Sequence, residues 1–400
     1  KALEAGGPYQ LQITGKDNQI SIKDILIGDV WLCSGQSNMQ WVVNNVTNAE
    51  VEKKNANYSQ IRTLNIPRRM ELSPKDTIST TWLVCSPETV GRFSGVAYFF
   101  ARKVYEETNI PIGIINSSWG GTIVETWTSL EAANTLPQKR LDRYNKNEKL
   151  SPPTEYFTRT NKEAKRNDYP SLVYNAMIHP LLSFAIKGVV WYQGENNVGN
   201  AEPYTDWLTC MISDWRNRWN SELPFYIIQL PNFDSTNKTP LWAEIRDAQR
   251  KVLTVPKTHL IVTSDLGDPH DLHPRNKQEV GMRVALQVLH HEYGRPDIVS
   301  ESPMFERMEI NGDKIIITFK NTGSGLEIRS RYGCLQGFTI AGEDKKFYWA
   351  QGELKDNRIV IWNPKVPNPI AVRYNWENNP DGNLYNKDGL PACLFRTDNW

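Results

Sequence analysis

The sequence predicts an α/β fold, in which a parallel sheet is covered by helices on both faces and a smaller β-rich region follows. Short apolar segments alternate with amphipathic segments between residues 27 and 300. The apolar segments are continuous rather than alternating, which is typical of parallel strands buried on both faces. After Pro296 the pattern changes to short alternating strands separated by turns.

The predicted strands are rich in Val, Ile or aromatic residues, and each ends at polar, Gly or Pro residues. They cover residues 30–33, 112–115, 188–192, 225–230 and 259–263. The segments between them carry apolar residues at every third or fourth position, which predicts helices. These helices are expected at residues 94–107, 172–185, 204–219, 241–253 and 276–293.

A chain of 400 residues is longer than one ordinary domain. We expect residues 1–26 to be the end of an N-terminal β region, 27–300 to form the α/β domain, and 301–400 to form a β-rich accessory region. Strands of the accessory region are expected at 314–319, 338–340, 347–349 and 358–362, with 9–22 joining them. Residues 136–168 are highly charged and contain Pro152-Pro153, which indicates a surface excursion that is either a lid or a solvated insertion.

Composition excludes several classes of partner. The net charge of +1 favours neither a nucleic acid nor an anionic membrane surface, and no apolar run is long enough to span a bilayer. The five cysteines (33, 85, 210, 334 and 393) have no spacing typical of a metal site or a disulfide framework, and their odd number leaves at least one free thiol. The opening segment KALEAGGPYQLQI is typical of the middle of a β region. We therefore expect upstream residues, with any export signal among them.

The most informative segment is GDVWLCSGQSNMQW, residues 28–41. Its apolar run stops abruptly in small polar residues, and ligands of open α/β sheets bind outside the carboxyl ends of the strands. Ser37 is therefore a candidate nucleophile, because a tight turn there can direct its hydroxyl toward a substrate. On these residues alone, a polar turn without chemistry explains the pattern equally well.

Further polar clusters follow other predicted strands. They are NSSWGG at 116–121, QGENN at 193–197, and Asp265 with DPHDLHP at 268–274. A parallel sheet brings such strand ends to one edge, which would place a serine, a histidine, carboxylates, amides and glycine N–H groups in one cleft. Acyl transfer needs a nucleophile, a base, a group that orients the base, and an oxyanion hole.

The blocks GQSNM, WGG, WYQGE and DLHP, in this order, resemble the SGNH-hydrolase superfamily and, within it, the sialate O-acetylesterase family of carbohydrate esterases. The resemblance runs from about residue 5 to the C-terminus, including HPRNKQEVGMRVAL (273–286) and NLYNKDGLPACLFRTD (383–398). It implies a three-layer αβα sandwich similar to flavodoxin, with β-rich accessory regions before and after it.

The resemblance assigns Ser37 as the nucleophile and His273 as the base. Superfamily members usually carry an aspartate three residues before this histidine, where this chain has His270. Asp271 is the nearest carboxylate and is favoured as the orienting group. Glu195 of the QGE block is the second candidate, and a backbone carbonyl is the third.

The remaining candidates bind rather than react. The expected oxyanion donors are the Ser37 N–H, a Gly120 or Gly121 N–H, and the side chain of Asn196 or Gln193. The expected substrate contacts are Trp119, Tyr192 and His270. No His, Cys, Asp or Glu spacing recommends a metal site, so no cofactor is expected.

The sequence therefore predicts a metal-independent serine esterase that removes acetyl groups from sugar hydroxyls, with O-acetylated sialic acids as the first substrates to test. Acetylxylan or another acetylated polysaccharide is the alternative substrate. A non-catalytic carbohydrate-binding protein is the alternative from another class. By resemblance to bacterial relatives, a periplasmic or secreted location is expected, and the oligomeric state is left open.

Overall fold

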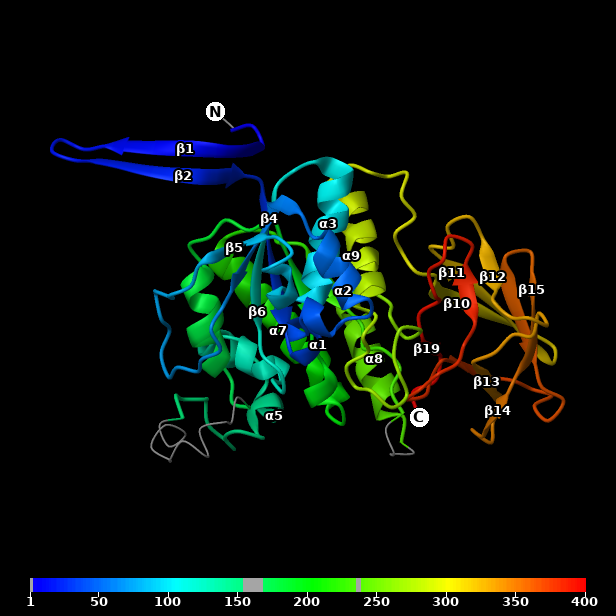
Figure 1. Cartoon of the computed structure of the whole chain (residues 1–400). Coiled ribbons are helices and arrows are strands. Elements are labelled where there is room, and N and C mark those ends of the chain that lie inside the picture. The colour runs from blue at the N-terminus through cyan, green and yellow to red at the C-terminus, as the bar shows by residue number, and fades with distance from the viewer. Residues whose placement is uncertain (1–2, 154–167, 235–238) are drawn as a thin grey trace. The chain divides into compact units, whose positions relative to one another are not determined.

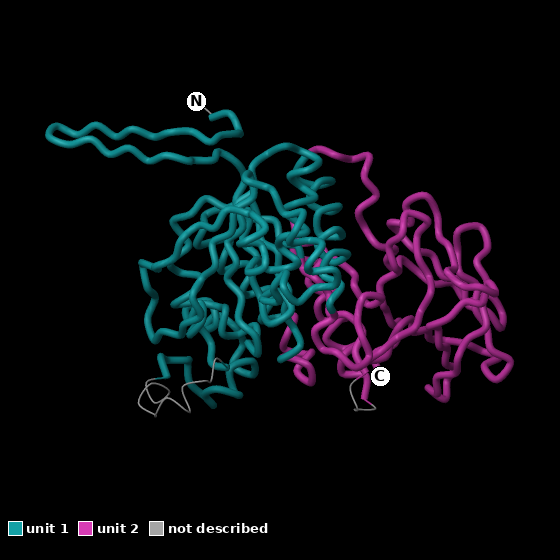
Figure 2. The backbone as a smooth tube through the Cα atoms, viewed as in Figure 1, with its two compact units in different colours: residues 1–196, 206–226, 275–293 teal, residues 197–205, 227–274, 294–400 magenta. Residues whose placement is uncertain are grey.

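The computed structural model describes residues 3–153, 168–234 and 239–400 (Figure 1). The chain forms two compact units (Figure 2). The first contains residues 1–196, 206–226 and 275–293, and the second contains 197–205, 227–274 and 294–400.

The α/β part is built on a seven-stranded sheet with the order β5-β4-β6-β3-β7-β8-β9. The strands are β3 (Asp29–Gly35), β4 (Tyr58–Asn65), β5 (Trp82–Cys85), β6 (Ile112–Ser118), β7 (Gly188–Tyr192), β8 (Phe225–Ile228) and β9 (Thr258–Ile261). β3 pairs in parallel with β6 and β7, and β4 pairs in parallel with β6. β5 runs antiparallel to β4, so the sheet is mixed at this edge.

The register of the central strands aligns their carboxyl ends. Gly35 at the end of β3 lies opposite Ser118 of β6 and Tyr192 of β7. The segments that follow these strands therefore leave the sheet at the same level. This alignment brings three of the predicted polar clusters to one place.

Helices cover both faces of this sheet. On one face Trp31 of β3 packs edge-on against Phe100 of α3 (Gly95–Thr108), with ring centroids 5.3 Å apart. α3 packs closely on α9 (Lys277–Glu292), because a Cβ at Gly281 would lie 2.7 Å from the Cβ of Phe99. On the other face Trp191 of β7 packs edge-on against Trp215 of α7 (Ala201–Trp219). The result is the three-layer α/β arrangement that the sequence predicts.

The other helical segments are mostly short and connect the strands. They are α1 (Ser37–Gln40), η1 (Val43–Asn45), α2 (Ala49–Asn55), η2 (Val90–Arg92), η3 (Val124–Trp127), α4 (Leu130–Ala133), α5 (Gln138–Leu141), η4 (Tyr174–Ile178), η5 (His179–Leu181), η6 (Glu195–Asn197), α8 (Leu241–Lys251) and η7 (Val252–Thr254). None of the helices in the described part of the chain combines the length and apolar character needed to span a bilayer.

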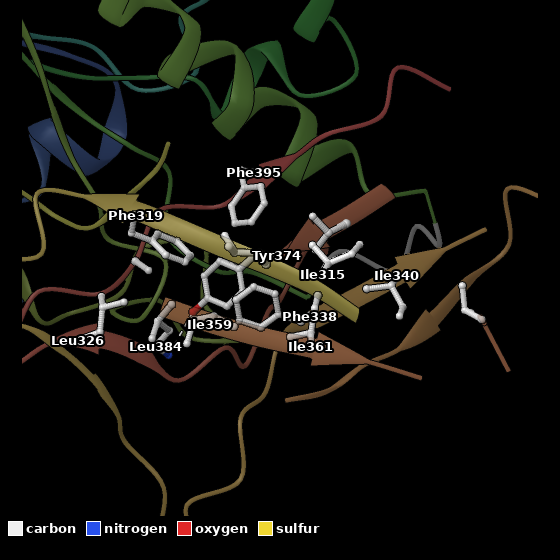
Figure 3. Close-up of a cluster of buried hydrophobic side chains, with 14 residues drawn as sticks. Ile315, Phe319, Leu326, Phe338, Ile340, Ile359, Ile361, Tyr374, Leu384 and Phe395 are labelled. Atoms are coloured by element: carbon white, nitrogen blue, oxygen red, sulfur yellow. Dashed lines mark hydrogen bonds between the residues drawn. The ribbon is translucent and has the colours of Figure 1, made fainter. Parts of the chain in front are cut away.

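The C-terminal region is made of antiparallel sheets with the orders β10-β11-β16-β15, β14-β13-β17-β19 and β12-β18. Its strands are β10 (Met304–Asn311), β11 (Lys314–Lys320), β12 (Leu326–Ile328), β13 (Phe338–Ala341), β14 (Phe347–Trp349), β15 (Gln351–Lys355), β16 (Arg358–Trp362), β17 (Ala371–Tyr374), β18 (Leu384–Asn386) and β19 (Phe395–Arg396). Alternate residues of these strands form one apolar core (Figure 3). Ile315 and Ile317 of β11 belong to it, as do Phe338 and Ile340 of β13.

Several predicted elements need correction. Residues 9–22 do not join the C-terminal strands; β1 (Gly6–Thr14) and β2 (Gln19–Ile27) pair with each other in a two-stranded sheet. The helix expected at 172–185 is instead a π-helical turn (η4) followed by a 3₁₀ turn (η5), because Pro180 has no N–H to continue an α-helix. β4 and β5 are absent from the predicted strands. Of the predicted excursion at 136–168, residues 154–167 lie outside the described part of the chain.

Candidate active site

Ser37 lies at the turn where β3 ends and α1 begins. The turn requires glycine at position 35, where φ is +134° and a Cβ would lie 2.1 Å from the Tyr192 carbonyl oxygen. Ser37 is partly exposed, whereas Gln36 and Asn38 on either side are buried. The serine is therefore the residue of this turn that solvent or a substrate can reach.

The side chain of Gln36 ties the nucleophile turn to the loop after β7. Its Oε1 accepts hydrogen bonds from Gln193 Nε2 at 3.2 Å and from the N–H groups of Gly194 and Asn196, each at 3.3 Å. Its own N–H donates to the Tyr192 carbonyl at 3.0 Å. One buried carboxamide thus holds the QGEN segment against the serine turn.

A second carboxamide ties the turn to the loop after β6. Gln40 Oε1 accepts the N–H of Gly120 at 2.8 Å, and the Trp119 N–H donates to the Gly35 carbonyl at 3.0 Å. A Cβ at Gly120 would lie 3.2 Å from the Cβ of Ser37. The WGG segment therefore lies directly beside the serine.

Asn38 connects the turn to two charged side chains. Its Nδ2 donates to Glu195 Oε1 at 2.5 Å, and its Oδ1 accepts from Lys277 Nζ at 2.5 Å. Glu195 as a residue is partly exposed, but its Oε2 is shielded from solvent and has no hydrogen-bond partner among the described residues. Burial raises the pKa of the Glu195 carboxyl, against the opposing effects of Asn38 and Lys277.

The expected oxyanion donors differ in how they are placed. Gln193 is fully buried and its Nε2 donates to Gln36 Oε1 and to the Thr122 carbonyl, which uses both amide hydrogens. In this arrangement Gln193 holds the framework of the site, and its role as an oxyanion donor stays a prediction. The Gly120 N–H is likewise engaged by Gln40.

Gly121 and Asn196 remain accessible. Both residues are exposed, and Gly121 has φ of +76°. Among the described residues, no hydrogen bond is recorded from the Gly121 N–H. Asn196 Nδ2 donates to the Gly121 carbonyl at 2.8 Å, which leaves its second amide hydrogen for another acceptor.

The two aromatic candidates for substrate binding, Trp119 and Tyr192, differ in exposure. Tyr192 is fully buried, with the Lys277 ammonium 5.7 Å from its ring centroid. A buried ring offers no face to a sugar in this arrangement, so the substrate contact expected of Tyr192 stays an untested prediction. Trp119 is partly exposed and stays a candidate.

His270, Asp271 and His273 belong to the second unit, where two short turns shape their loop. Asp268 Oδ1 accepts the His270 N–H at 2.8 Å, and Asp271 Oδ1 accepts the His273 N–H at 2.8 Å. His270 is exposed, whereas Asp271 and His273 are partly exposed. The Asp271 carboxylate thus binds the backbone N–H of His273.

The cysteine beside the serine strand has the surroundings of a core residue. Cys33 beside the serine strand is fully buried, and burial raises the pKa of its thiol, as expected for a core residue. All five cysteines are free.

Four polar residues of the site do not appear among the candidates from sequence. They are Gln36, Asn38, Gln40 and Lys277. The first three flank Ser37 in GQSNMQ, where polar residues directly after a buried strand are the available signal. Lys277 lies in an amphipathic helical pattern and carries no comparable signal.

Comparisons with known proteins show which family the chain resembles. The family model "Carbohydrate esterase, sialic acid-specific acetylesterase" matches residues 27–290. Human sialate O-acetylesterase is 32% identical over 348 residues, which cover 78% of this chain and 63% of the human protein. Mouse sialate O-acetylesterase is 29% identical over 428 residues, which cover 94% of this chain and 78% of the mouse protein. The chain thus spans less than two thirds of the length of the human relative.

A solved structure is similar over the whole chain. It is a carbohydrate acetylesterase from Xanthomonas citri, with a TM-score of 0.89 and 36% sequence identity, and the match covers 100% of this chain and 87% of that one. The family model, the relatives and this structure lead to one assignment. The chain belongs to the sialic acid-specific acetylesterase family of carbohydrate esterases.

Proposed function

We propose that this chain is a serine esterase that hydrolyses O-acetyl esters of carbohydrates, with O-acetylated sialic acids as the first substrates. The observation that carries the proposal is the partly exposed Ser37 between buried Gln36 and Asn38, at the meeting point of three strand ends. A serine in such a turn is the arrangement that nucleophilic catalysis requires.

In the proposed mechanism Ser37 Oγ attacks the acetyl carbonyl while His273 accepts the serine proton. The Ser37 and Gly121 N–H groups, with the Asn196 side chain, stabilise the oxyanion of the tetrahedral intermediate. The C–O bond to the sugar then breaks, and His273 gives its proton to the departing sugar oxygen. Water attacks the acetyl-serine, His273 takes a water proton and returns it to Ser37, and acetate is released.

Two carboxylates compete for the role of orienting His273. Asp271 is the first candidate, because its carboxylate already shapes the His273 turn. Glu195 is the second, because it lies beside the nucleophile turn with a buried oxygen that has no partner among the described residues. A carboxylate in either role stabilises the imidazolium that forms during acyl transfer.

The substrate class rests on the relatives. The mammalian relatives are named sialate O-acetylesterases, whereas the Xanthomonas citri structure is described as a carbohydrate acetylesterase. Trp119 is the proposed sugar-stacking residue, because it is a partly exposed aromatic residue directly before Gly120. We also propose a periplasmic or secreted location, from the resemblance to bacterial relatives, and cell fractionation tests it.

An acetate-release assay across O-acetylated sialic acids, acetylated xylan and an aryl acetate tests the proposal. Hydrolysis of the aryl acetate together with a preference for sialic acid esters is expected. A preference for xylan would change the substrate while keeping the chemistry. No hydrolysis of any ester by a folded protein that binds the sugars would instead identify a carbohydrate-binding protein.

A further inference from the structure

Lys277 occupies an electrostatically unfavourable position. It is fully buried, and it is the first residue of α9. The positive end of a helix dipole lies there, so a cation is disfavoured, and a buried ammonium also loses its hydration. Close packing of α3 on α9 fixes the position, since a Cβ at Gly95 would lie 3.2 Å from the Cβ of Lys277. Such a placement needs a compensating interaction.

Asn38 supplies part of that compensation by accepting a hydrogen bond from Lys277, and it links Lys277 to Glu195. An ammonium can only donate hydrogen bonds, so the side-chain oxygen of Asn38 must face Lys277. The Asn38 amide nitrogen is then forced toward Glu195, where it donates to Oε1. The orientation of one carboxamide thus couples a cation on α9 to a carboxylate after β7, through the residue that follows Ser37.

We infer that Lys277 and Asn38 are positioning residues, which hold the Glu195 carboxylate and the Ser37 turn in one fixed arrangement for catalysis. This inference rests on the proposed esterase activity. Glu195 then provides a fixed negative charge beside the nucleophile, whichever carboxylate orients His273. Fixed charges near developing charge act strongly in a shielded site because they need no rearrangement during the reaction.

The charge of Glu195 gives the inference a pH readout. Burial raises the pKa of Glu195, while Asn38, the backbone N–H groups of Glu195 and Gly194, and the charge of Lys277 lower it. Removing the Lys277 charge must raise this pKa further. Activity that depends on ionised Glu195 would then begin to fall at a higher pH on acidification.

The experiment is a double-mutant cycle between Lys277→Met and Glu195→Gln, with kcat/KM for an aryl acetate measured across pH. Lys277→Met removes the ammonium at similar volume. The matched control is Arg283→Met, which removes another buried cation of α9, one that pairs with Glu279. Thermal unfolding is measured for every variant.

We expect Lys277→Met to lower kcat/KM by roughly 10- to 100-fold, mainly through kcat, as for small misplacements of catalytic groups. The fall in rate that Glu195 adds to that of His273, identified by its absence from Glu195→Gln, should move to higher pH in Lys277→Met. The effect of Lys277→Met should largely disappear in the Glu195→Gln background, because coupled residues are not additive. Arg283→Met should leave both the rate and the pH profile unchanged.

Each of three results would overturn the inference. The first is additive effects of Lys277→Met and Glu195→Gln on kcat/KM, the second is a Glu195-dependent fall in rate that stays at the same pH in Lys277→Met, and the third is an equal loss of kcat/KM in Arg283→Met. If Lys277→Met does not fold, Asn38→Asp replaces it. That variant keeps an acceptor for Lys277 and places a carboxylate against Glu195. The fall in rate caused by protonation of Glu195 is therefore again expected at a higher pH than in the wild type. A wild-type enzyme that hydrolyses no ester overturns the proposed function itself, whereas an active wild type without coupling overturns the inference alone.

Discussion

The loops around Ser37 and the core of the C-terminal β-sandwich are held together by different forces. Hydrogen bonds accepted by the side chains of Gln36 and Gln40 and donated by that of Asn38 fix the nucleophile turn, whereas the sandwich core contains buried aliphatic and aromatic side chains (Figure 3). Hydrogen bonds are directional and cost free energy when a buried partner is missing. Apolar burial is non-directional and adds stability in proportion to area. The first region is thus built for geometry and the second for stability, and substitutions in each should have separable effects.

Ser37→Ala gives the largest expected effect in the nucleophile turn. The loss of the attacking oxygen should lower kcat by several powers of ten, as for other triad residues. The side-chain hydrogen bonds of Gln36, Asn38 and Gln40 stay in place in this variant, so thermal unfolding should change little. Steady-state kinetics and calorimetry of the purified variant check both statements, and retention of more than a few per cent of activity would exclude Ser37 as the nucleophile.

Substitutions of the carboxylates Asp271 and Glu195 have the next largest expected effects on catalysis. If Asp271 orients His273, Asp271→Asn should lower kcat by roughly a thousandfold, with KM little changed. The asparagine oxygen can still accept the His273 N–H, so the loop should keep its shape. Glu195→Gln should have a smaller effect. The opposite ranking in the same assay would move the orienting role to Glu195, and near-normal rates in both would favour a backbone carbonyl.

Phe338→Ala should separate stability from activity in the sandwich. Phe338 is 1% exposed and packs on Tyr374 with ring centroids 4.4 Å apart. Truncating a buried phenylalanine costs about 3–5 kcal/mol of unfolding free energy. Activity per folded molecule should stay near the wild-type value at low temperature. Chemical denaturation checks the first part, and a stable but inactive variant would contradict the second.

Glu195→Gln should have a small stabilising effect with a defined pH dependence. Because burial raises the pKa of this acid, the folded state binds its proton more tightly than the unfolded chain does. The contribution of Glu195 to stability is therefore greatest at low pH. It is lost as the pH rises from the ordinary pKa of a glutamic acid through the raised pKa of Glu195 in the folded state. The variant should be at least as stable as wild type at neutral pH, with the difference shrinking toward pH 4. A melting temperature well below wild type at neutral pH would show that the charge stabilises the fold.

Treatment with a metal chelator should leave the rate of ester hydrolysis unchanged. The proposed mechanism activates Ser37 through a neutral histidine, so exhaustive chelator treatment should leave the rate unchanged. The rate should also fall on acidification through about pH 6 to 7.5, the ordinary range of a histidine, because a protonated imidazole cannot accept a proton. Loss of activity on chelation with recovery on adding zinc would contradict this.

The strands that position the site were predictable because their apolar runs are continuous. β3, β6 and β7 begin and end close to the expected residues. β4 and β5 were not predictable, because β4 interleaves Ser, Gln, Arg and Thr with its apolar residues, and Trp82 and Val84 of β5 are exposed. A single sequence carries little apolar signal for such strands.

The same limit applies within the site. Ser37 was predictable because it follows a buried strand in a glycine-containing turn. The roles of Gln36, Asn38 and Lys277 were not, because each acts through a partner on another strand or helix. Pairing them requires the register that aligns Gly35 with Tyr192. The burial of Tyr192 and Gln193 was not predictable for the same reason, since the sequence shows their chemistry but not their surroundings.

Covalent labelling of the serine tests directly whether Ser37 is the nucleophile. The intact protein is treated with a fluorophosphonate, which reacts with activated serines, and the adduct is located by peptide mass spectrometry. We expect one adduct, on Ser37, whose formation abolishes ester hydrolysis and which is absent from Ser37→Ala. An adduct on a different residue, or active enzyme whose Ser37 stays unlabelled, would contradict it.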